Sequence, residues 1–287
     1  MARRYSPLIK APVNKIIPSS VVDGPGNRTA IFFQSCNFNC RYCHNPETIN
    51  MCINCGECVA KCPIKALSFE NGKVVWDQNK CCACDTCIKT CKHDASPRIA
   101  YMSPEEVWAK VERNLPFIRG ITVSGGECTL QEDFVYELFK IAKAHGLSTL
   151  LDSNGSLDFE KDPKLLEVAD GVMLDVKAHD NESHRWLTGQ DIDTVLKNLE
   201  YLARVHKLEE VRTVCIPEAL ENEKTIEKVC KILKPYLKDQ DIRYKLIKYR
   251  HFGVRQQYRD FKEPDDEYME KLKDLAKQGG FRNIVII

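Results

Sequence analysis

Short apolar runs alternate with amphipathic segments along most of the chain. Each run of four to six mainly apolar residues ends in glycine or polar residues, and a stretch with helical spacing follows most of them. This alternation predicts a parallel sheet with helices outside it. The expected strands are 29–34, 120–124, 148–152, 171–175, 211–216 and 244–247, with 282–287 as a candidate last strand.

Helix boundaries are also visible in the sequence. Ser103 is expected to cap a helix, with Pro104 at its first position and Glu106 three residues after the cap. A second helix is expected over about 131–145 and is closed by Gly146. Further helices are expected near 160–169, 190–206, 222–237 and 265–278. Six strands connected in this way predict an incomplete (β/α)6 barrel rather than a closed eight-stranded one.

Residues 51–97 differ in composition from the rest and are expected to be an insert. Within them, 66–76 predicts a hairpin with Asn71 and Gly72 at its turn. The expected division is therefore a barrel made of 1–50 and 98–287, interrupted by a small domain. Residues 1–28 carry few periodic signals, apart from a turn at Asp23-Gly24-Pro25-Gly26.

The composition fits a packed globular protein and excludes some functions. Of the 287 residues, 43% are hydrophobic and 29% are charged, and the net charge of +1 gives no indication of nucleic-acid binding. No run approaches the roughly 18 apolar residues of a membrane span. The N-terminal Met1-Ala2-Arg3-Arg4 is not followed by an apolar signal core, so we expect a cytoplasmic protein without a membrane partner.

Cysteines are the most informative residues. Twelve of the fifteen lie between Cys36 and Cys91. In a secreted protein such a density indicates disulfides, but without a signal segment the C-x2-C repeats favour metal or iron–sulfur ligation.

The loop from Cys36 to Cys43 follows the first expected strand directly. Its spacing is Cys36-x3-Cys40-x2-Cys43, with Tyr42 before the last cysteine and His44 after it. Three thiolates on a cubane cluster leave one iron free to bind a substrate. A zinc knuckle is the alternative. The spacing resembles the signature of radical S-adenosylmethionine (SAM) enzymes.

Two further cysteine runs occur in the insert. Each is C-x2-C-x2-C-x3-C, and each resembles the bacterial two-cluster ferredoxin run, in which the fourth cysteine ligates the other cluster. Two zinc sites are the alternative. Lys92 stands where proline usually follows the second run, and Cys82 fits no ligand spacing, although it is only one residue from Cys81. The ferredoxin pattern implies one cluster on Cys52, Cys55, Cys58 and Cys91, and another on Cys62, Cys81, Cys84 and Cys87.

Polar residues recur where successive strands end. Ser124-Gly125-Gly126-Glu127 ends one strand, and its glycines would let a ligand approach the backbone while Glu127 accepts from an ammonium group. The next strands end in Asp152-Ser153-Asn154-Gly155 and in Met173-Leu174-Asp175-Val176-Lys177. Because the carboxyl ends of parallel strands lie at one edge of a sheet, we expect these residues to face the Cys36–Cys43 loop.

Together these motifs resemble those of the glycyl-radical-enzyme activating enzymes, and the chain looks most like their YjjW-type members. The resemblance covers about 15–255 and rests on the Asp23 turn, the cysteine loop, the insert and the three strand-end motifs. It implies a [4Fe–4S] cluster on Cys36, Cys40 and Cys43, two auxiliary clusters in the insert, and SAM bound at the open iron. It also implies that Asp23, Gly24, Pro25 and Gly26 contact the partner's peptide backbone.

The resemblance further implies the SAM contacts and a cation site. Gly125, Gly126 and Glu127 would contact the methionyl amine. The other SAM contacts would come from Tyr42, His44, Asp152, Asp175, Val176, Lys177 and Arg212, together with Arg250 or His251. Related activating enzymes bind a monovalent cation, Na⁺ or K⁺, and the matching positions are Asp152, Ser153, Met173 and Asp175.

Two positions depart from the family pattern. The family places a histidine three residues before a glycine near the sixth strand, but here Arg250 has that position and His251 comes one later. Cys128 stands where proline commonly follows Gly-Gly-Glu. It is interpreted, like Cys215 and Cys230, as a buried structural thiol.

The resemblance implies that the chain cleaves SAM reductively and that the resulting 5′-deoxyadenosyl radical takes a hydrogen atom from a glycine Cα of a partner enzyme. The insert would relay electrons from a ferredoxin or flavodoxin, or would dock the partner. Two other functions stay open from the sequence: a radical SAM enzyme that acts on a small molecule, and a ferredoxin-type electron-transfer protein.

Overall fold

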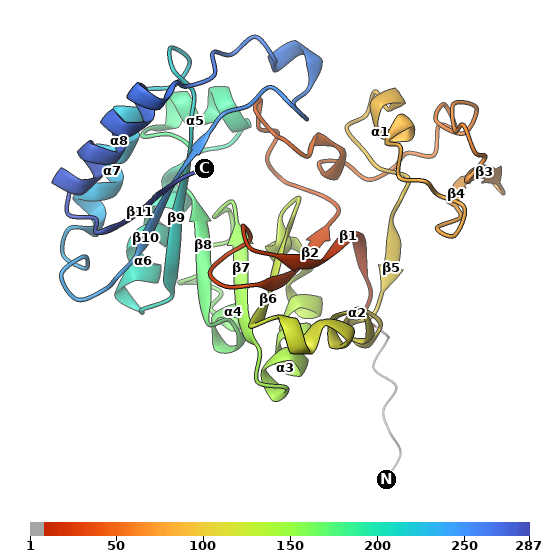
Figure 1. The fold of residues 1–287 in the computed structure, drawn as a ribbon, viewed down its shortest axis with the longest axis horizontal. Helices are drawn as coiled ribbons and strands as arrows, with labels where there is room; N and C mark the ends of the chain where they lie inside the picture. The colour runs from red at the N-terminus through yellow and green to blue at the C-terminus, as the bar shows by residue number, and fades with distance from the viewer. Residues whose placement is uncertain (1–8) are drawn as a thin grey trace.

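The computed structural model describes residues 9–287, so the expectation about the N-terminal arginines lies outside the described residues. Within 9–287, nine strands form one sheet in the order β11-β10-β9-β8-β7-β6-β2-β1-β5 (Figure 1). Strands β2 and β6 to β11 are parallel to one another, β1 is antiparallel to β2, and β5 is antiparallel to β1. The strands are β1 (Ala11–Ser20), β2 (Arg28–Phe33), β5 (Ala100–Met102), β6 (Gly120–Gly125), β7 (Ser148–Ser153), β8 (Gly171–Asp175), β9 (Leu208–Cys215), β10 (Arg243–Lys248) and β11 (Asn283–Ile286).

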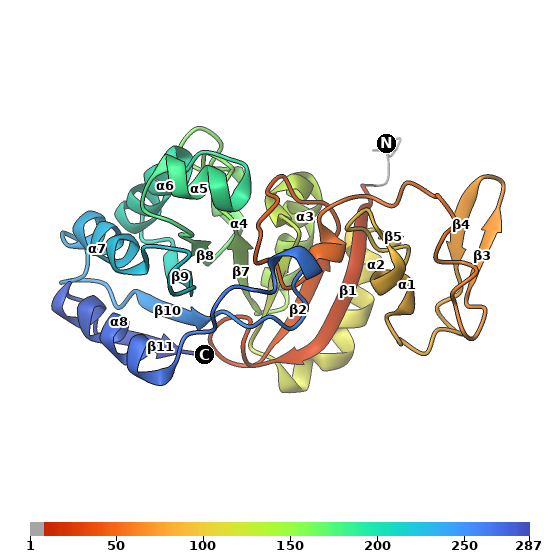
Figure 2. The same ribbon diagram turned by 90° about the horizontal axis from the view of Figure 1, so that it is seen from above.

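Helices cover the outer face of this curved sheet, as Figure 2 shows. The apolar core lies between the two layers and includes the fully buried Phe33, Ile121 and Leu151. The predicted α/β fold with a mostly parallel sheet is therefore confirmed. The helices are α2 (Pro104–Val111), α3 (Glu132–Ala144), α4 (Lys164–Val168), α5 (Asn181–Thr188), α6 (Asp193–Arg204), α7 (Asn222–Leu233) and α8 (Asp266–Gln278), with 3₁₀ turns η1 (Pro46–Thr48), η2 (Glu112–Phe117), η3 (Cys128–Gln131) and η4 (Gln256–Tyr258).

Local sequence signals determine several helix ends. The Ser103 hydroxyl accepts from the Glu106 amide (3.3 Å), and the Glu106 carboxylate accepts from the Ser103 amide (2.7 Å), which forms the predicted capping box. Helix α3 ends at Ala144, and Gly146 then takes a positive φ of 75°. Helix α4 is shorter than predicted because it begins only after Pro163, and Asn181–Thr188 is a helix that the sequence pattern did not predict.

Strand β1 was also not predicted, although it is the longest strand in the described residues. Pro12 and Pro18 interrupt its alternation, and two register shifts against β2 break its pairing. Proline removes a ladder donor, so such a segment does not resemble a strand from its sequence. Strand β1 nevertheless forms because β2 on one side and β5 on the other supply partners along its length.

The inserted segment forms a separate lobe, which lies at the right of Figure 1 beyond β5. It contains the predicted hairpin of β3 (Leu67–Glu70) and β4 (Lys73–Trp76), followed by the short helix α1 (Thr86–Thr90). A small hydrophobic cluster of its own includes Cys58, Leu67 and Cys87. Its two ends meet where Asn50 and Ala95 form a β-bridge, as an insertion into a continuous fold requires. The domain boundaries themselves stay a prediction.

Candidate functional site

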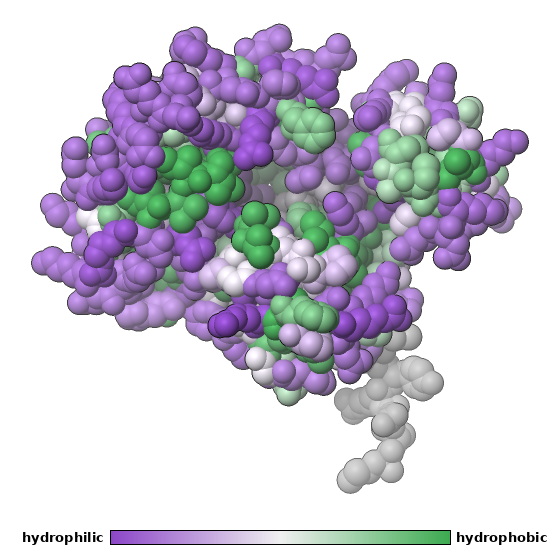
Figure 3. Space-filling view, viewed as in Figure 1, coloured by the Kyte–Doolittle hydropathy of each residue, from purple (hydrophilic) through white to green (hydrophobic). Residues whose placement is uncertain are grey.

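A cavity of about 210 Å³ lies at the carboxyl ends of strands β6 to β9, next to the loop that follows β2. Cys36, Cys40 and Cys43 line one side of it. Strand-end residues line the other side, namely Ser124, Asp152, Ser153, Asn154, Asp175, Lys177 and Arg212. The space-filling view is hollowed near its centre, between the main body and the smaller lobe (Figure 3). The structure thus brings the cysteine loop and the strand-end side chains to one cavity.

Backbone hydrogen bonds hold the cysteine loop in place. The amide of Ser35, which has a positive φ of 85°, donates to the Thr48 carbonyl (2.8 Å), and the Cys36 amide donates to the Ile49 carbonyl (2.9 Å). At the other side of the loop, the Asn39 amide donates to the Thr188 carbonyl (2.9 Å). Helix α5 therefore supports the loop, although its role was not predicted.

Arg255 is a further support that the sequence gave no reason to select. Its guanidinium donates to the Cys40 carbonyl (2.8 Å) and to the Asn39 side chain (2.6 Å), and it pairs with Asp94 (3.0 Å) at the end of the insert. One buried side chain thus joins the cysteine loop, the insert and the segment after β10. The residues around Arg255 form no motif in the sequence that would indicate a role in supporting the cysteine loop.

Burial disfavours the charged form of the loop thiols. It raises the pKa of Cys36 to about 12 and that of Cys43 to about 12, and it also raises the pKa of Cys40. Because a thiolate is the ligand form, metal binding must displace these protons and supply the charge compensation. The buried, unbridged thiols on one wall of the cavity are the donor set that a cluster requires.

The Gly-Gly-Glu segment packs closely against the start of the cysteine loop. A Cβ on Gly126 would lie 2.0 Å from the Ser35 carbonyl oxygen, and one on Gly125 would lie 2.3 Å from the Phe33 amide nitrogen. These glycines allow the close approach to β2 that places the cysteine loop, although both also line the cavity. The carboxylate of Glu127 is fully buried outside the cavity lining. It accepts from the Asn154 amide (2.7 Å), the Ser153 hydroxyl (2.9 Å) and the Thr129 hydroxyl (2.7 Å). Its contact with an ammonium group stays a prediction.

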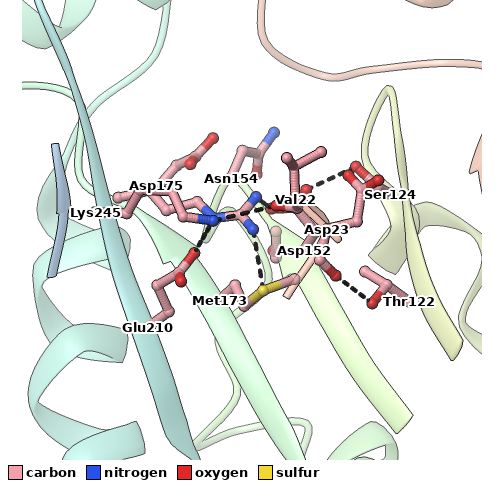
Figure 4. A network of polar contacts seen from close by, with 12 residues as sticks. Val22, Asp23, Thr122, Ser124, Asp152, Asn154, Met173, Asp175, Glu210 and Lys245 are labelled. Atoms are coloured by element: carbon pink, nitrogen blue, oxygen red, sulfur yellow. Dashed lines mark hydrogen bonds and ion pairs between the residues drawn. The ribbon is translucent and has the colours of Figure 1, made fainter. Parts of the chain in front are cut away.

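A buried charge network crosses the strand ends below the cavity (Figure 4). Arg212 on β9 pairs with Asp152 on β7 (2.7 Å) and with Glu210 (2.5 Å), and Glu210 also pairs with Lys245 on β10 (3.0 Å). Asp152 accepts from the Ser124 hydroxyl as well (2.8 Å). Burial raises the pKa of Asp152, and the Arg212 charge opposes that shift. The network fixes the side chains of β6, β7, β9 and β10 relative to one another.

Glu210 and Lys245 are the members of this network that sequence reasoning missed. Lys245 lies within a predicted strand between Tyr244 and Leu246, and Glu210 directly precedes the predicted strand 211–216. Charged side chains within a buried strand are rare unless they are paired. That rarity was the available signal, but the partner of each residue could not be known without the strand order.

The predicted cation ligands are engaged by protein groups. Asp152 pairs with Arg212, whose other nitrogen contacts the Met173 sulfur (3.0 Å), while Asp175 accepts from Lys177 (2.5 Å). The Ser153 hydroxyl donates to Glu127. Among residues 9–287, no three His, Cys, Asp or Glu side chains are arranged to hold a single metal ion. The expected cation ligands include the Met173 backbone carbonyl as well as side chains, and the cation site stays a prediction.

The cavity does contain groups suited to a polar ligand. The Lys177 ammonium lies 5.7 Å from the centre of the Tyr42 ring. The buried Tyr42 hydroxyl has no hydrogen-bond partner, which is costly unless a ligand supplies one. An ammonium, two carboxylates and a hydroxyl beside three thiols suit an amino acid carboxylate and a ribose.

Three of the predicted contact residues, Val176, Arg250 and His251, do not line the cavity, and their contacts with SAM stay predictions. Neither Arg250 nor His251 lines the cavity, because Ile247 is the β10 residue there and the side chain of His251 pairs with Glu263 (2.5 Å). His44 does line it, and its ring nitrogen contacts the Arg250 carbonyl (2.9 Å). The Val176 side chain is fully buried outside the cavity lining, and its carbonyl accepts from the Thr213 hydroxyl (2.9 Å).

The Asp23–Gly26 turn folds inward beneath the cavity, as Figure 4 shows for its first residue. The Asp23 carbonyl accepts from the Thr122 hydroxyl (2.6 Å), and the preceding Val22 carbonyl accepts from Lys245 (3.2 Å). Gly24 has a positive φ of 115°. The turn thus lies next to the charge network, and its contact with a partner peptide stays a prediction.

The insert cysteines gather in two small cavities. One is lined by Cys52, Cys55, Cys58 and Cys91, and the other by Cys62, Cys81, Cys84 and Cys87, with Cys82 also in the second. These are the two groups of four that the crossed ferredoxin pattern implies. The ligand sets themselves stay a prediction.

No helix among residues 9–287 has the length and apolar character needed to cross a membrane.

Comparison with known proteins identifies the family. The pattern of the radical SAM superfamily matches residues 30–231. The chain is 30% identical, over 97% of each chain, to a Haemophilus influenzae protein with the provisional name glycyl-radical enzyme activating enzyme. It is also 30% identical to the pyruvate formate-lyase-activating enzyme of Streptococcus mutans, over 84% of this chain and 78% of that one. In fold it is similar to QueE from Escherichia coli, with a TM-score of 0.55 at 11% identity over 97% of this chain and 94% of that one.

Proposed function

Because the chain belongs to the radical SAM superfamily, we propose that it activates a glycyl radical enzyme by reductive cleavage of SAM. The observation that carries the proposal is the cavity that combines Cys36, Cys40 and Cys43 with the strand-end carboxylates and Lys177. Relatives that match almost the whole chain carry names of activating enzymes, which favours a protein substrate over a small molecule.

The residues present suit both a [4Fe–4S] cluster and SAM. Cys36, Cys40 and Cys43 would hold the cluster through three thiolates. Lys177 would bind the methionyl carboxylate, and the unpartnered Tyr42 hydroxyl would gain a polar contact. When bound, the reduced cluster and SAM supply a 5′-deoxyadenosyl radical that removes a hydrogen atom from a glycine Cα, leaving methionine, 5′-deoxyadenosine and a glycyl radical.

The chain's own residues position these groups and limit access of water. Arg255 and helix α5 hold the cysteine loop at the strand ends. The Arg212 guanidinium offsets part of the cost of burying the Asp152 carboxylate, although burial still raises the pKa of Asp152. No step in this proposal uses a monovalent cation.

The function is tested by isotope transfer from the partner. With a glycyl radical enzyme that carries Cα-deuterated glycine, we expect one deuterium in the 5′-deoxyadenosine product and a glycyl radical signal in the electron paramagnetic resonance spectrum. Both follow from a direct transfer between the glycine Cα and the 5′ carbon. Sustained SAM cleavage without deuterium in the product would assign the radical to another substrate.

We also propose that the insert is a ferredoxin-like domain with two [4Fe–4S] clusters, as in the YjjW-type enzymes. The grouping of its cysteines into two cavities, one four-cysteine set in each, supports this assignment. Two such clusters in one domain favour a relay of electrons from a ferredoxin or flavodoxin.

Replacement of Cys55 and Cys84 by alanine tests the relay. Together the two substitutions remove one ligand from each auxiliary set, Cys55 from one and Cys84 from the other, while leaving Cys36–Cys43 intact. We expect activation to persist with a strong chemical reductant and to fall at least about tenfold with reduced flavodoxin, because the auxiliary clusters then no longer pass electrons to the catalytic cluster. Cys82→Ala is the matched control and should change neither rate. Equal rates with both donors in the double variant would show that the insert does not relay electrons.

A further inference from the structure

A second and larger cavity, of about 650 Å³, lies between the insert and the edge of the sheet. We call it the insert groove and define it by Val13 on β1, Met102 on β5, Lys110 on α2, and Trp76 and Ile88 in the insert. It shares no lining residue with the SAM cavity. The proposed reaction uses none of these residues, so the groove needs a separate explanation.

The insert groove is predominantly cationic. Its charged residues are Lys15, Arg98, Lys110 and Arg113 against Glu47 and Asp85. Arg98 is paired with Asp85 (2.5 Å), but within residues 9–287 neither Lys110 nor Arg113 makes an ion pair. Unpaired cations beside an apolar floor attract an anionic surface and repel a cationic one.

The groove adjoins only one of the two cysteine groups. Trp76, Asp85 and Arg98 line both the groove and the cavity of Cys62, Cys81, Cys84 and Cys87. The cavity of Cys52, Cys55, Cys58 and Cys91 shares no residue with the groove. Exposure does not distinguish the groups, since Cys55 of one and Cys84 of the other are both exposed, but the shared lining residues do. A redox partner in the groove would therefore be nearest to the group that contains Cys84.

We propose that the insert groove docks an acidic one-electron carrier protein, which reduces the cluster of Cys62, Cys81, Cys84 and Cys87. One electron passes from the reduced carrier to the oxidised cluster, so the carrier is oxidised by one electron and no bond is made or broken. The inference rests on the proposed function for its need of electrons. It adds the docking surface, the charge of the partner, and which auxiliary cluster is reduced first.

The test is a charge reversal at the unpaired cations, Lys110→Glu with Arg113→Glu, in the reconstituted full-length protein. Both side chains are at least partly exposed and neither makes an ion pair within residues 9–287, so the fold is expected to tolerate the two substitutions. The matched control is Lys228→Glu with Lys231→Glu on α7, which changes the net charge equally on the opposite side of the molecule (Figure 1). The probe is an acidic flavodoxin, with binding measured by calorimetry and cluster reduction by visible absorbance without SAM.

We expect the groove variant to weaken flavodoxin binding at least about tenfold at low ionic strength, and the control by less than about twofold. The difference should shrink in high salt, because exposed charges are screened. Reduction by photoreduced deazaflavin should be unchanged. Equal flavodoxin binding by both variants would overturn the proposal. It would also be overturned if the groove variant lost cluster reduction by deazaflavin as strongly as it lost flavodoxin binding. Failure of the wild-type protein to cleave SAM with deazaflavin would contradict the proposed function instead, while the binding result would still stand.

Discussion

Replacement of Cys40 by alanine is expected to abolish reductive SAM cleavage. Cys40 lies in the middle of the three-cysteine loop, is almost fully buried, and has its carbonyl held by Arg255 at 2.8 Å. Without its thiolate, only two protein ligands face the cavity from this loop, and a cubane held by two ligands cannot keep a single open iron next to the strand ends. We expect 5′-deoxyadenosine formation to fall at least about 1,000-fold, more than about 4 kcal/mol of barrier.

The measurement is anaerobic product analysis after reconstitution, with iron content determined on the same sample. Cys230→Ala is the matched control, because Cys230 is also buried but lies on α7, away from the cavity. The control should retain cleavage and the wild-type iron content. A Cys40 variant that still forms 5′-deoxyadenosine at a comparable rate would remove the basis for the assignment of the cavity.

Replacement of Arg212 by alanine is expected to destabilise the protein by about 3–5 kcal/mol, because it leaves the buried Asp152 carboxylate without its paired cation and removes one of the cations around Glu210. Its guanidinium pairs with Asp152 at 2.7 Å and with Glu210 at 2.5 Å, and Glu210 is fully buried. Burial alone would lower the pKa of Arg212, but Asp152 and Glu210 raise it, so the arginine stays charged. Glu210 would keep Lys245 at 3.0 Å and Arg243 at 3.3 Å, and burial lowers the pKa of Lys245, whereas Asp152 would lose the cation that pairs with it.

The free energy of unfolding, measured by urea denaturation of the anaerobic protein, tests this expectation. Arg204→Ala is the control, because Arg204 makes an ion pair with Glu160 at 2.5 Å while its side chain is half exposed. Solvent screens such a pair, and its loss should cost less than about 1 kcal/mol. Similar losses in the two variants would show that the Arg212 network contributes no more than a surface pair.

Part of the fold could be predicted from the sequence because it depends on local patterns. The strands around Ile121 and Leu151 are short apolar runs, the Ser103 capping box is complete within four residues, and the Asn71-Gly72 turn favours positive φ at both positions. Strand β1 could not be predicted from the sequence. Its prolines argue against a strand, and only the neighbours β2 and β5, distant in sequence from each other, provide its hydrogen bonds.

The candidate site divides in the same way. The spacing of Cys36, Cys40 and Cys43 and the polar residues after each strand are local, so the sequence predicts a site at the carboxyl edge of the sheet. The burial of Glu127, the outward position of Arg250 and His251, and the contact of Arg255 with the Cys40 carbonyl depend on side-chain packing between segments far apart in the chain. No spacing rule describes such contacts.

The sequence by itself therefore determined the chemistry: which residue types stand at strand ends and in which cysteine runs. Spacing along a chain is sufficient for that, because a loop or a strand end brings its own residues together. The tertiary structure alone decided the electrostatics. Asp152, Glu210, Arg212 and Lys245 neutralise one another only because β7, β9 and β10 place them in contact, and the insert groove exists only because a lobe from 51–97 lies beside β1 and β5. Charges act through distance in space, which the order of residues does not specify.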